Sequence, residues 1–217
     1  MTIAVVDYGV GNLGSVLKAF RHVGATAELT SDAAVLRGAD ALVLPGDGAF
    51  GATMDEIRAR GLDRLIAEAA ADGRWVLGIC IGMQVLFEES EEHGLHRGLG
   101  LLEGRVRRLE TGLPVPHMGW NRLRWPRPHP LLDGIDQGRH VYFVHSFFCD
   151  AAPEVVVATT DYGADYAAVV ARGTVLGVQF HPEKSQAAVL RLIENFARLV
   201  SGASASRPAA IAAGGGA

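Results

Sequence analysis

The sequence contains little cysteine and almost no lysine. Its two cysteines, Cys80 and Cys149, have neither the density of a disulfide scaffold nor the spacing of a metal site, and we expect Cys149 to fill the core or a strand edge. Lys18 and Lys184 are the only lysines. The net charge is −4, with acidic and basic residues interspersed. These shortages exclude a disulfide-rich secreted domain and argue against a nucleic-acid-binding surface.

Long hydrophobic runs are also missing. The apolar stretch at residues 75–87 is too short and too interrupted by glycine to span a bilayer. The first residues enter a strand directly, without a basic segment, so we expect no signal peptide and a cytoplasmic protein. Hydrophobic residues are plentiful, at 49% of 217, which is enough for the core of one large domain.

Strand-like and helix-like segments alternate along the first part of the chain. We predict strands at 2–7, 26–29, 41–44 and 75–79, and helices at 12–23, within 52–71 and at 83–90. Short strands follow at 102–109, 118–125, 141–149, 155–160, 167–171 and 175–180, the last two as a hairpin, before a closing helix at 186–200. Such alternation indicates a three-layer domain over residues 1–200, in which helices cover both faces of a mixed, mainly parallel sheet. Residues 201–217 are rich in Ser, Ala, Gly and Pro, and we expect a disordered tail there.

The most informative segment is the end of the strand at 75–79, which continues as Gly78-Ile79-Cys80-Ile81-Gly82. Glycines two residues before and two after a reactive residue permit a sharp strand-to-helix turn that exposes its side chain at the edge of a sheet. At a helix N-terminus, unpaired N–H groups and the helix dipole would stabilise negative charge on the Cys80 sulfur. A cysteine alone could equally be a small apolar residue that ends a core strand.

A second segment supplies the partners that a cysteine nucleophile needs. Another apolar strand ends in His181-Pro182-Glu183. A thiol nucleophile requires a base to take its proton and a carboxylate to orient that base. His181 and Glu183 are two residues apart, so an extended backbone would point both side chains to the same side. Each could singly be a capping residue, but with Cys80 they predict a catalytic triad at one edge of the sheet.

The cysteine segment and the His-Pro-Glu segment together resemble those of the class I (triad) glutamine amidotransferases. Asp7-Tyr8-Gly9-Val10-Gly11-Asn12 and Met118-Gly119-Trp120-Asn121 point more narrowly to the glutaminase subunits of imidazole glycerol phosphate synthases, from histidine biosynthesis. The matching segments extend from residue 7 to residue 185. The resemblance implies a flavodoxin-like, three-layer α/β/α glutamine amidotransferase domain.

By this resemblance, glutamine is the substrate and Cys80 forms a thioester with it, while His181 moves the proton and Glu183 orients the imidazole. The backbone N–H groups of Ile81 and Gly48 would bind the oxyanion. Gln84 could equally be a helix-surface amide, and Glu92 part of a solvated acidic run. The implied glutamine-binding residues are Gly46, Gln84, Glu92, His145, Ser146 and Phe147.

The loop that would supply an oxyanion donor departs from the family pattern. That pattern is generally Pro-Gly-Val-Gly, whereas this chain has Pro45-Gly46-Asp47-Gly48. A carboxylate near a developing oxyanion is unfavourable unless it points to solvent or pairs with a cation. Because the donor is a backbone group, we expect the oxyanion site to survive with Asp47 present.

The resemblance also implies a partner. Free ammonia mostly becomes ammonium in neutral water, and a glutaminase of this size has no room for an acceptor domain. The implied partner is a cyclase subunit with a (β/α)₈ barrel, in a heterodimer whose interface includes Asn12, Trp120 and Lys184. Trp120 could instead be a core aromatic, and Lys184 a solvated lysine. We expect no cofactor, metal, nucleic acid or membrane, because the remaining histidines show no ligand spacing.

Three alternatives remain open at this point. Gly9-Val10-Gly11-Asn12-Leu13-Gly14 is a literal Gly-x-Gly-x-x-Gly, with Glu28 near the position of a ribose-binding acid, which allows a dinucleotide-binding oxidoreductase. That reading leaves Cys80 and His181 unexplained. The chain could also serve a different synthase, which Met-Gly-Trp-Asn disfavours, or be a catalytically silent interaction subunit, which an intact triad disfavours.

Overall fold

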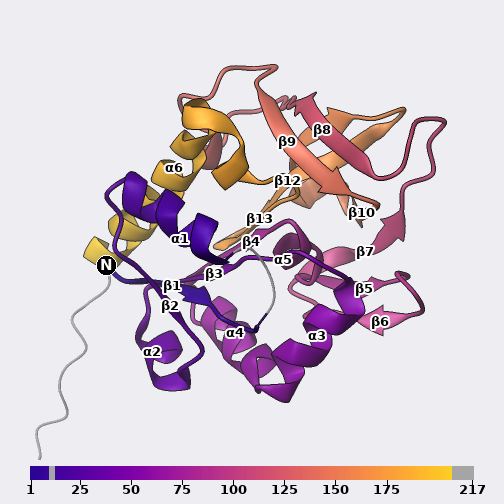
Figure 1. The fold of residues 1–217 in the computed structure, drawn as a ribbon. Helices are drawn as coiled ribbons and strands as arrows, with labels where there is room; N and C mark the ends of the chain where they lie inside the picture. Colours follow the sequence, from indigo (N-terminus) through magenta and orange to yellow (C-terminus); the bar gives the residue numbers. More distant parts are fainter. Residues whose placement is uncertain (10–12, 207–217) are drawn as a thin grey trace, which may run out of the picture.

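The computed structural model describes residues 1–9 and 13–206, and its centre is a seven-stranded sheet (Figure 1). Five strands lie parallel to their neighbours, in the spatial order β13-β4-β3-β1-β2. The antiparallel strands β12 and β11 extend the sheet beyond β13. The predicted mixed, mainly parallel sheet is therefore confirmed. The strands are β1 (Ile3–Val6), β2 (Ala27–Thr30), β3 (Ala41–Leu44), β4 (Trp75–Ile79), β11 (Val156–Asp161), β12 (Asp165–Arg172) and β13 (Val175–Val178).

Helices cover both faces of this sheet, as predicted. Helices α1 (Leu13–His22) and α6 (Gln186–Ser206) lie on one face, and α2 (Ala33–Gly38), α3 (Phe50–Ala59) and α4 (Leu62–Ala71) on the other (Figure 1). Successive residues of a strand point to opposite faces, so a strand covered on both sides must be apolar throughout. Strand β1 has this property: Ile3 and Val5 belong to one core, and its other two residues belong to the second.

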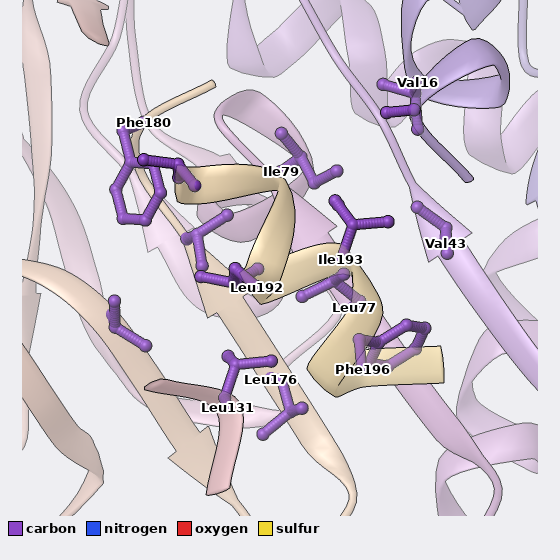
Figure 2. Close-up of a cluster of buried hydrophobic side chains, with 14 of the residues drawn as sticks. Val16, Val43, Leu77, Ile79, Leu131, Leu176, Phe180, Leu192, Ile193 and Phe196 are labelled. Atoms are coloured by element: carbon purple, nitrogen blue, oxygen red, sulfur yellow. The ribbon is translucent and has the colours of Figure 1, made fainter. Parts of the chain in front are cut away.

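The core beneath α1 and α6 is packed around aromatic rings (Figure 2). Phe196 of α6 is fully buried and meets Phe20 and Trp75 edge to face, at centroid distances of 6.2 and 6.5 Å. Leu77, Ile79 and the neighbouring strand residues fill the space beneath α6 (Figure 2). This packing anchors α6, and with it the chain that leaves the end of β13.

Two smaller sheets lie beside the main one (Figure 1). The first has the order β10-β7-β5-β6 and the second is the antiparallel pair β8–β9. Three 3₁₀ turns, η1 (Pro130–Leu132), η2 (Pro153–Val155) and η3 (Pro182–Lys184), complete the connections. The strands are β5 (Phe87–Ser90), β6 (His96–Arg97), β7 (Leu102–Arg108), β8 (His117–Arg122), β9 (His140–His145) and β10 (Phe147–Ala151).

Two sequence predictions of secondary structure are wrong. The helix expected at 83–90 is the single turn α5 (Ile81–Gln84), followed by β5, because the buried run from Val85 to Phe87 leads into pairing with β7. The single strand expected at 141–149 is two strands in different sheets, broken at Ser146, because β9 pairs with β8 and β10 pairs with β7. Local apolar patterns could not reveal these pairings.

Other boundaries differ in smaller ways. Helix α2 was not predicted, although Asp32 is a recognisable N-cap whose carboxylate accepts N–H bonds from Ala34 and Val35. The hairpin of β12 and β13 and the burial of Cys149 are confirmed. Helix α6 continues to Ser206, past the expected end at 200, and residues 207–217 of the expected tail lie outside the described residues. Among the described helices, none is long and apolar enough to cross a membrane.

Candidate active site

Cys80 occupies the sharp turn between β4 and α5 that the glycine pattern predicts. Its backbone has φ 54° and ψ −113°, a strained conformation for a residue with a side chain, costing about 1–3 kcal/mol. A Cβ added to Gly78 would lie 2.3 Å from the Gly82 carbonyl oxygen, and one added to Gly82 would lie 1.8 Å from that of Leu44. Only glycine fits at these two positions, so the turn depends on both. The Cys80 N–H donates to the Val178 carbonyl at 2.8 Å, which ties the turn to β13.

His181 and Glu183 follow the end of β13, the strand next to β4. The His181 Nδ1 lies 2.8 Å from Glu183 Oε1, and both side chains are about 2% exposed. The predicted proximity is present but its expected reason was wrong, because residues 182–184 form the 3₁₀ turn η3 rather than extended backbone. Neighbouring parallel strands thus bring Cys80, His181 and Glu183 to the same edge of the sheet.

Ser185 supports this arrangement and was missed by the sequence reasoning. Its hydroxyl donates to the His181 carbonyl at 2.5 Å and accepts the Tyr142 N–H at 3.0 Å. The His181 N–H in turn donates to the Tyr142 carbonyl at 3.0 Å. Strand β9 therefore holds the backbone of His181 from one side. The only sequence signal was a hydroxyl residue two positions after Glu183.

The electrostatics of His181 favour the imidazolium. Burial alone would lower its pKa, but hydrogen bonding and charge interactions with Cys80 and Glu183 outweigh burial and raise the pKa of His181 to about 10. Within the described structure, no partner of His181 Nε2 meets the distance and angle limits of a hydrogen bond. Its interaction with Cys80 is therefore a looser polar contact. Apo sites are often looser than substrate complexes in this way. An imidazolium beside Cys80 is the arrangement that favours a nucleophilic sulfur.

A pocket of about 390 Å³ opens in front of Cys80. This is within the usual size range for small-molecule sites. Gly46, predicted to bind substrate, instead packs behind the pocket wall, where an added Cβ would lie 1.8 Å from Ile81 Cγ2. Pro116 and Val144 contribute to the wall and were not predicted. The lining residues are Asp47, Gly48, Cys80, Ile81, Gln84, Glu92, Pro116, Val144, His145, Ser146 and Phe147.

Gln84 faces inward and is not a helix-surface amide. It is 3% exposed, and its Nε2 donates to the Phe147 carbonyl at 3.1 Å and to Gln179 Oε1 at 3.0 Å. Gln179 Nε2 lies 3.7 Å from the Cys80 sulfur, within reach of a weak hydrogen bond. Gln179, which sequence reasoning did not single out as a site residue, thus links Gln84 to Cys80.

Glu92 is more than part of a solvated acidic run. Its Oε2 accepts the N–H of Phe50, the first residue of α3, at 2.6 Å. Glu88 and Glu91 likewise accept backbone N–H groups, from Gly104 at 3.0 Å and from β7 at 2.9 Å. Carboxylates at helix N-termini are favoured by the unpaired N–H groups there. Glu92 is therefore held against the loop that carries Asp47 and Gly48.

The two predicted oxyanion donors border the same pocket. Ile81 is the first residue of α5, where N–H groups have no partner within the helix. Gly48 has φ +109°, a conformation that suits glycine, and open space where a side chain would be. Asp47 also lines the pocket and approaches the imidazole: its Oδ1 lies 3.8 Å from His181 Nε2, with the side chain 43% exposed.

Two of the three predicted interface residues lie within the described structure, and both are exposed. Trp120 is 46% exposed, so it is not a core aromatic, and it pairs across β8 and β9 with Tyr142, which binds the backbone of His181. Lys184 is exposed at the end of η3. Asn12, and with it part of the Gly-x-Gly-x-x-Gly segment, lies outside the described residues. Within the described chain, no cluster of His, Cys, Asp or Glu has the arrangement of a metal site.

Comparison with known proteins agrees with this architecture. The sequence model of the class-I glutamine amidotransferases matches residues 4–199, and the chain belongs to that family. It is 51% identical over 207 residues to imidazole glycerol phosphate synthase subunit HisH of Symbiobacterium thermophilum, covering 95% of this chain and 98% of the relative. The subunit of the same name from Salinibacter ruber is 50% identical over 211 residues, covering 94% of this chain and 97% of the relative.

The same fold is found in solved structures of lower sequence identity. The crystal structure of a glutamine amidotransferase has a TM-score of 0.73 at 24% identity and covers 91% of this chain and 98% of that one. The structure of PurLQS from Thermotoga maritima has a TM-score of 0.72 at 21% identity, covering 92% of this chain and 98% of that one. The predicted fold class, an α/β glutamine amidotransferase domain, is thereby confirmed.

Proposed function

We propose that this chain is the glutaminase subunit of an imidazole glycerol phosphate synthase and that Cys80, His181 and Glu183 are its catalytic triad. The observation that carries the proposal is the meeting of a strained Cys80 turn with the His181–Glu183 pair at the ends of neighbouring parallel strands. Relatives about 50% identical over most of the chain bear that subunit name. Its pathway is histidine biosynthesis and its place is the cytoplasm.

Hydrolysis proceeds in two halves. The Cys80 sulfur attacks the side-chain amide carbon of glutamine, and its proton is held by His181, whose imidazolium Glu183 orients. The tetrahedral intermediate collapses as His181 protonates the leaving nitrogen, so the carbon–nitrogen bond breaks and ammonia departs. Water then attacks the thioester, with His181 taking its proton, and glutamate leaves as the sulfur is restored.

The pocket binds the substrate and its oxyanion. The N–H of Ile81 and the N–H of Gly48 stabilise the negative oxygen, and losing one such donor typically costs about 3–4 kcal/mol. Gln84, Glu92 and the segment 145–147 line the pocket that receives the amino-acid part of glutamine. Gly46 acts indirectly, because its lack of a side chain lets the loop pack against Ile81.

Ammonia is consumed on a partner chain, a cyclase subunit with a (β/α)₈ barrel, in a heterodimer. Ammonium formed in bulk water would lose its nucleophilicity, so the partner covers the face on which the triad opens. The exposure of Trp120 and Lys184 supports their place in this interface, and the exposed Met118, two positions before Trp120 on β8, would add apolar area to it. Asn12 completes the proposed interface. Ammonia and a ribulosyl phosphate intermediate yield imidazole glycerol phosphate and an aminoimidazole carboxamide ribotide.

The test is glutamate release by the purified chain, alone and with a histidine-pathway cyclase subunit plus its nucleotide substrate. Stimulation by cyclase and ligand, abolished in Cys80→Ala, is the expected result. Activity that does not respond to the cyclase would support the glutaminase reaction but would assign the chain to a different synthase. A folded chain that docks yet hydrolyses no glutamine under any condition would overturn the proposal in favour of a silent interaction subunit.

A further inference from the structure

A continuous line of hydrogen bonds runs from β8 to the glutamine pocket. Asn121 Nδ2 lies 3.2 Å from His117 Nε2, and His117 Nδ1 lies 3.0 Å from His145 Nε2. His145 Nδ1 lies 2.8 Å from the Phe147 carbonyl oxygen. His117 is 3% exposed and does not line the pocket, so the triad mechanism gives it no role.

Geometry assigns the protons along this line. The Phe147 carbonyl can only accept, so His145 Nδ1 carries a proton. Neutral imidazole has one N–H, so His145 Nε2 accepts, and the donor to it is His117 Nδ1–H. His117 Nε2 is then an acceptor, which matches the amide N–H of Asn121. A single arrangement satisfies every contact, and it requires both histidines to be neutral.

The surroundings keep both histidines neutral. Burial is the largest cause that lowers the pKa of His117 and of His145, to about 4 in each case. The charge of His181 acts in the same direction on His145. The His117 ring stacks between Phe143 and Tyr162, at centroid distances of 4.7 and 4.0 Å. A second proton on His145 would place two donors 3.0 Å apart, and one on His117 would face the Asn121 amide N–H at 3.2 Å.

The Phe147 carbonyl is where this line meets the active site. It accepts from His145 and also from Gln84, which bonds to Gln179 beside the Cys80 sulfur. Removing the His117 donor would leave the buried His145 Nε2 without a partner. His145 would keep its proton on Nδ1, because the Phe147 carbonyl still accepts it, but its ring would no longer be held from the β8 side. The pocket wall at 145–147 would lose one of its fixed contacts.

We propose that His117 is a positioning residue for glutamine binding: its Nδ1–H binds Nε2 of His145 and so holds the ring that donates to the Phe147 carbonyl in the pocket wall. The kinetic consequence rests on the proposed glutaminase function. The order of the protons on the two histidines does not depend on that function. The group acts through His145 and touches no substrate atom.

The experiment compares two substitutions of His117. His117→Phe keeps a ring between Phe143 and Tyr162 but removes the donor, whereas His117→Asn keeps an N–H near the position of Nδ1. His140→Phe, an exposed histidine on the same hairpin, is the matched control. Steady-state glutaminase kinetics and ¹⁵N NMR of the histidine rings are measured on each chain, the kinetics with the cyclase subunit bound.

His117→Phe is expected to raise the KM for glutamine about tenfold, the scale of one hydrogen bond, with kcat changed less than threefold. His117→Asn and the control should stay within about threefold of the parent KM. NMR should show His145 protonated at Nδ1 in the parent and in both His117 variants, with the resonance of its Nε2 shifted in His117→Phe, which lacks the donor to that atom, and little changed in His117→Asn. A variant that merely loses folded protein would lower the maximal rate and leave KM unchanged.

Two results would overturn the inference: an unchanged KM and an unchanged His145 Nε2 resonance in His117→Phe, or Nε2 protonation of His145 in the parent chain. If His117→Phe does not fold, the tautomers of the parent and of His117→Asn decide. If the parent chain hydrolyses no glutamine, the proposed function fails, while the NMR result still decides whether His117 donates to His145.

Discussion

Replacing Asp47 by asparagine is predicted to accelerate glutamine hydrolysis. The Asp47 carboxylate borders the pocket beside the two expected oxyanion donors and lies 3.8 Å from His181 Nε2. Its attraction to protonated His181 is present both before and after the attack, so it cancels. Its repulsion grows in the tetrahedral intermediate, because negative charge moves from the Cys80 sulfur to an oxygen nearer the Asp47 loop. Only the second effect changes the barrier.

The size of the effect follows from distance and exposure. If the oxyanion forms about 4 Å from the Asp47 carboxylate, two unit charges at that separation interact by about 1 kcal/mol in water and by about 4 kcal/mol at an effective dielectric constant of 20. The Asp47 side chain is 43% exposed, so the lower value applies. A barrier lowered by about 1 kcal/mol corresponds to a rate about fivefold higher.

The assay is glutamate release at saturating glutamine, for the parent, Asp47→Asn and Asp47→Glu, with and without the cyclase subunit. Asp47→Asn should be faster and Asp47→Glu, which keeps the charge, should not. Because the charge is half exposed, salt should raise the parent rate and leave that of Asp47→Asn nearly unchanged. A slower Asp47→Asn, or a gain shared by Asp47→Glu, would refute the electrostatic reasoning.

Three further predictions concern the triad, the turn and the buried histidines. Glu183→Gln should lower kcat by about 10³–10⁴ with little change in KM, because the imidazole loses its orienting carboxylate; a loss below tenfold in steady-state assays would contradict that role. Gly82→Ala should destabilise the fold by more than about 3 kcal/mol in urea unfolding, since its Cβ would lie 1.8 Å from a backbone carbonyl oxygen, whereas Gly14→Ala, with open space around it, should not; equal effects would remove the steric argument. His117 and His145 have pKa values of about 4, below the value near 6.5 expected in the unfolded chain. Their contribution to stability should therefore be full above pH 6.5 and be lost as the pH falls toward 4. A free energy of unfolding that is flat across that pH range would show that the two histidines are not held neutral.

Much of this protein was readable from local sequence. The parallel strands are continuous apolar runs, because both of their faces are buried, and each was located to within a residue or two. The turn at Cys80 was predicted because steric exclusion of a Cβ at Gly78 and Gly82 is a property of those two positions. Proximity of His181 and Glu183 was also local, since they are two positions apart in the sequence. Such features depend on residues that are close together in the chain, and these can be read from the sequence alone.

What the sequence left open depended on contacts between distant segments. The residues from Val85 to Phe87 have a pattern that suits a helix, but Phe87 belongs to a strand because it pairs with β7. The chain breaks at Ser146 because the strands before and after it pair in two different sheets. Gln179 carried no motif, yet it stands between Gln84 and the Cys80 sulfur.

The same holds for His117 and His145, which are 28 residues apart. Their side chains form a hydrogen bond because the register of β8 and β9 places these two residues opposite each other. Local patterns of size, charge and backbone freedom were enough to predict the fold class and to propose Cys80, His181 and Glu183 as the triad. The pairing of buried polar groups could be known only from the three-dimensional arrangement, because a hydrogen bond needs partners within about 3 Å and long-range pairing alone sets those distances.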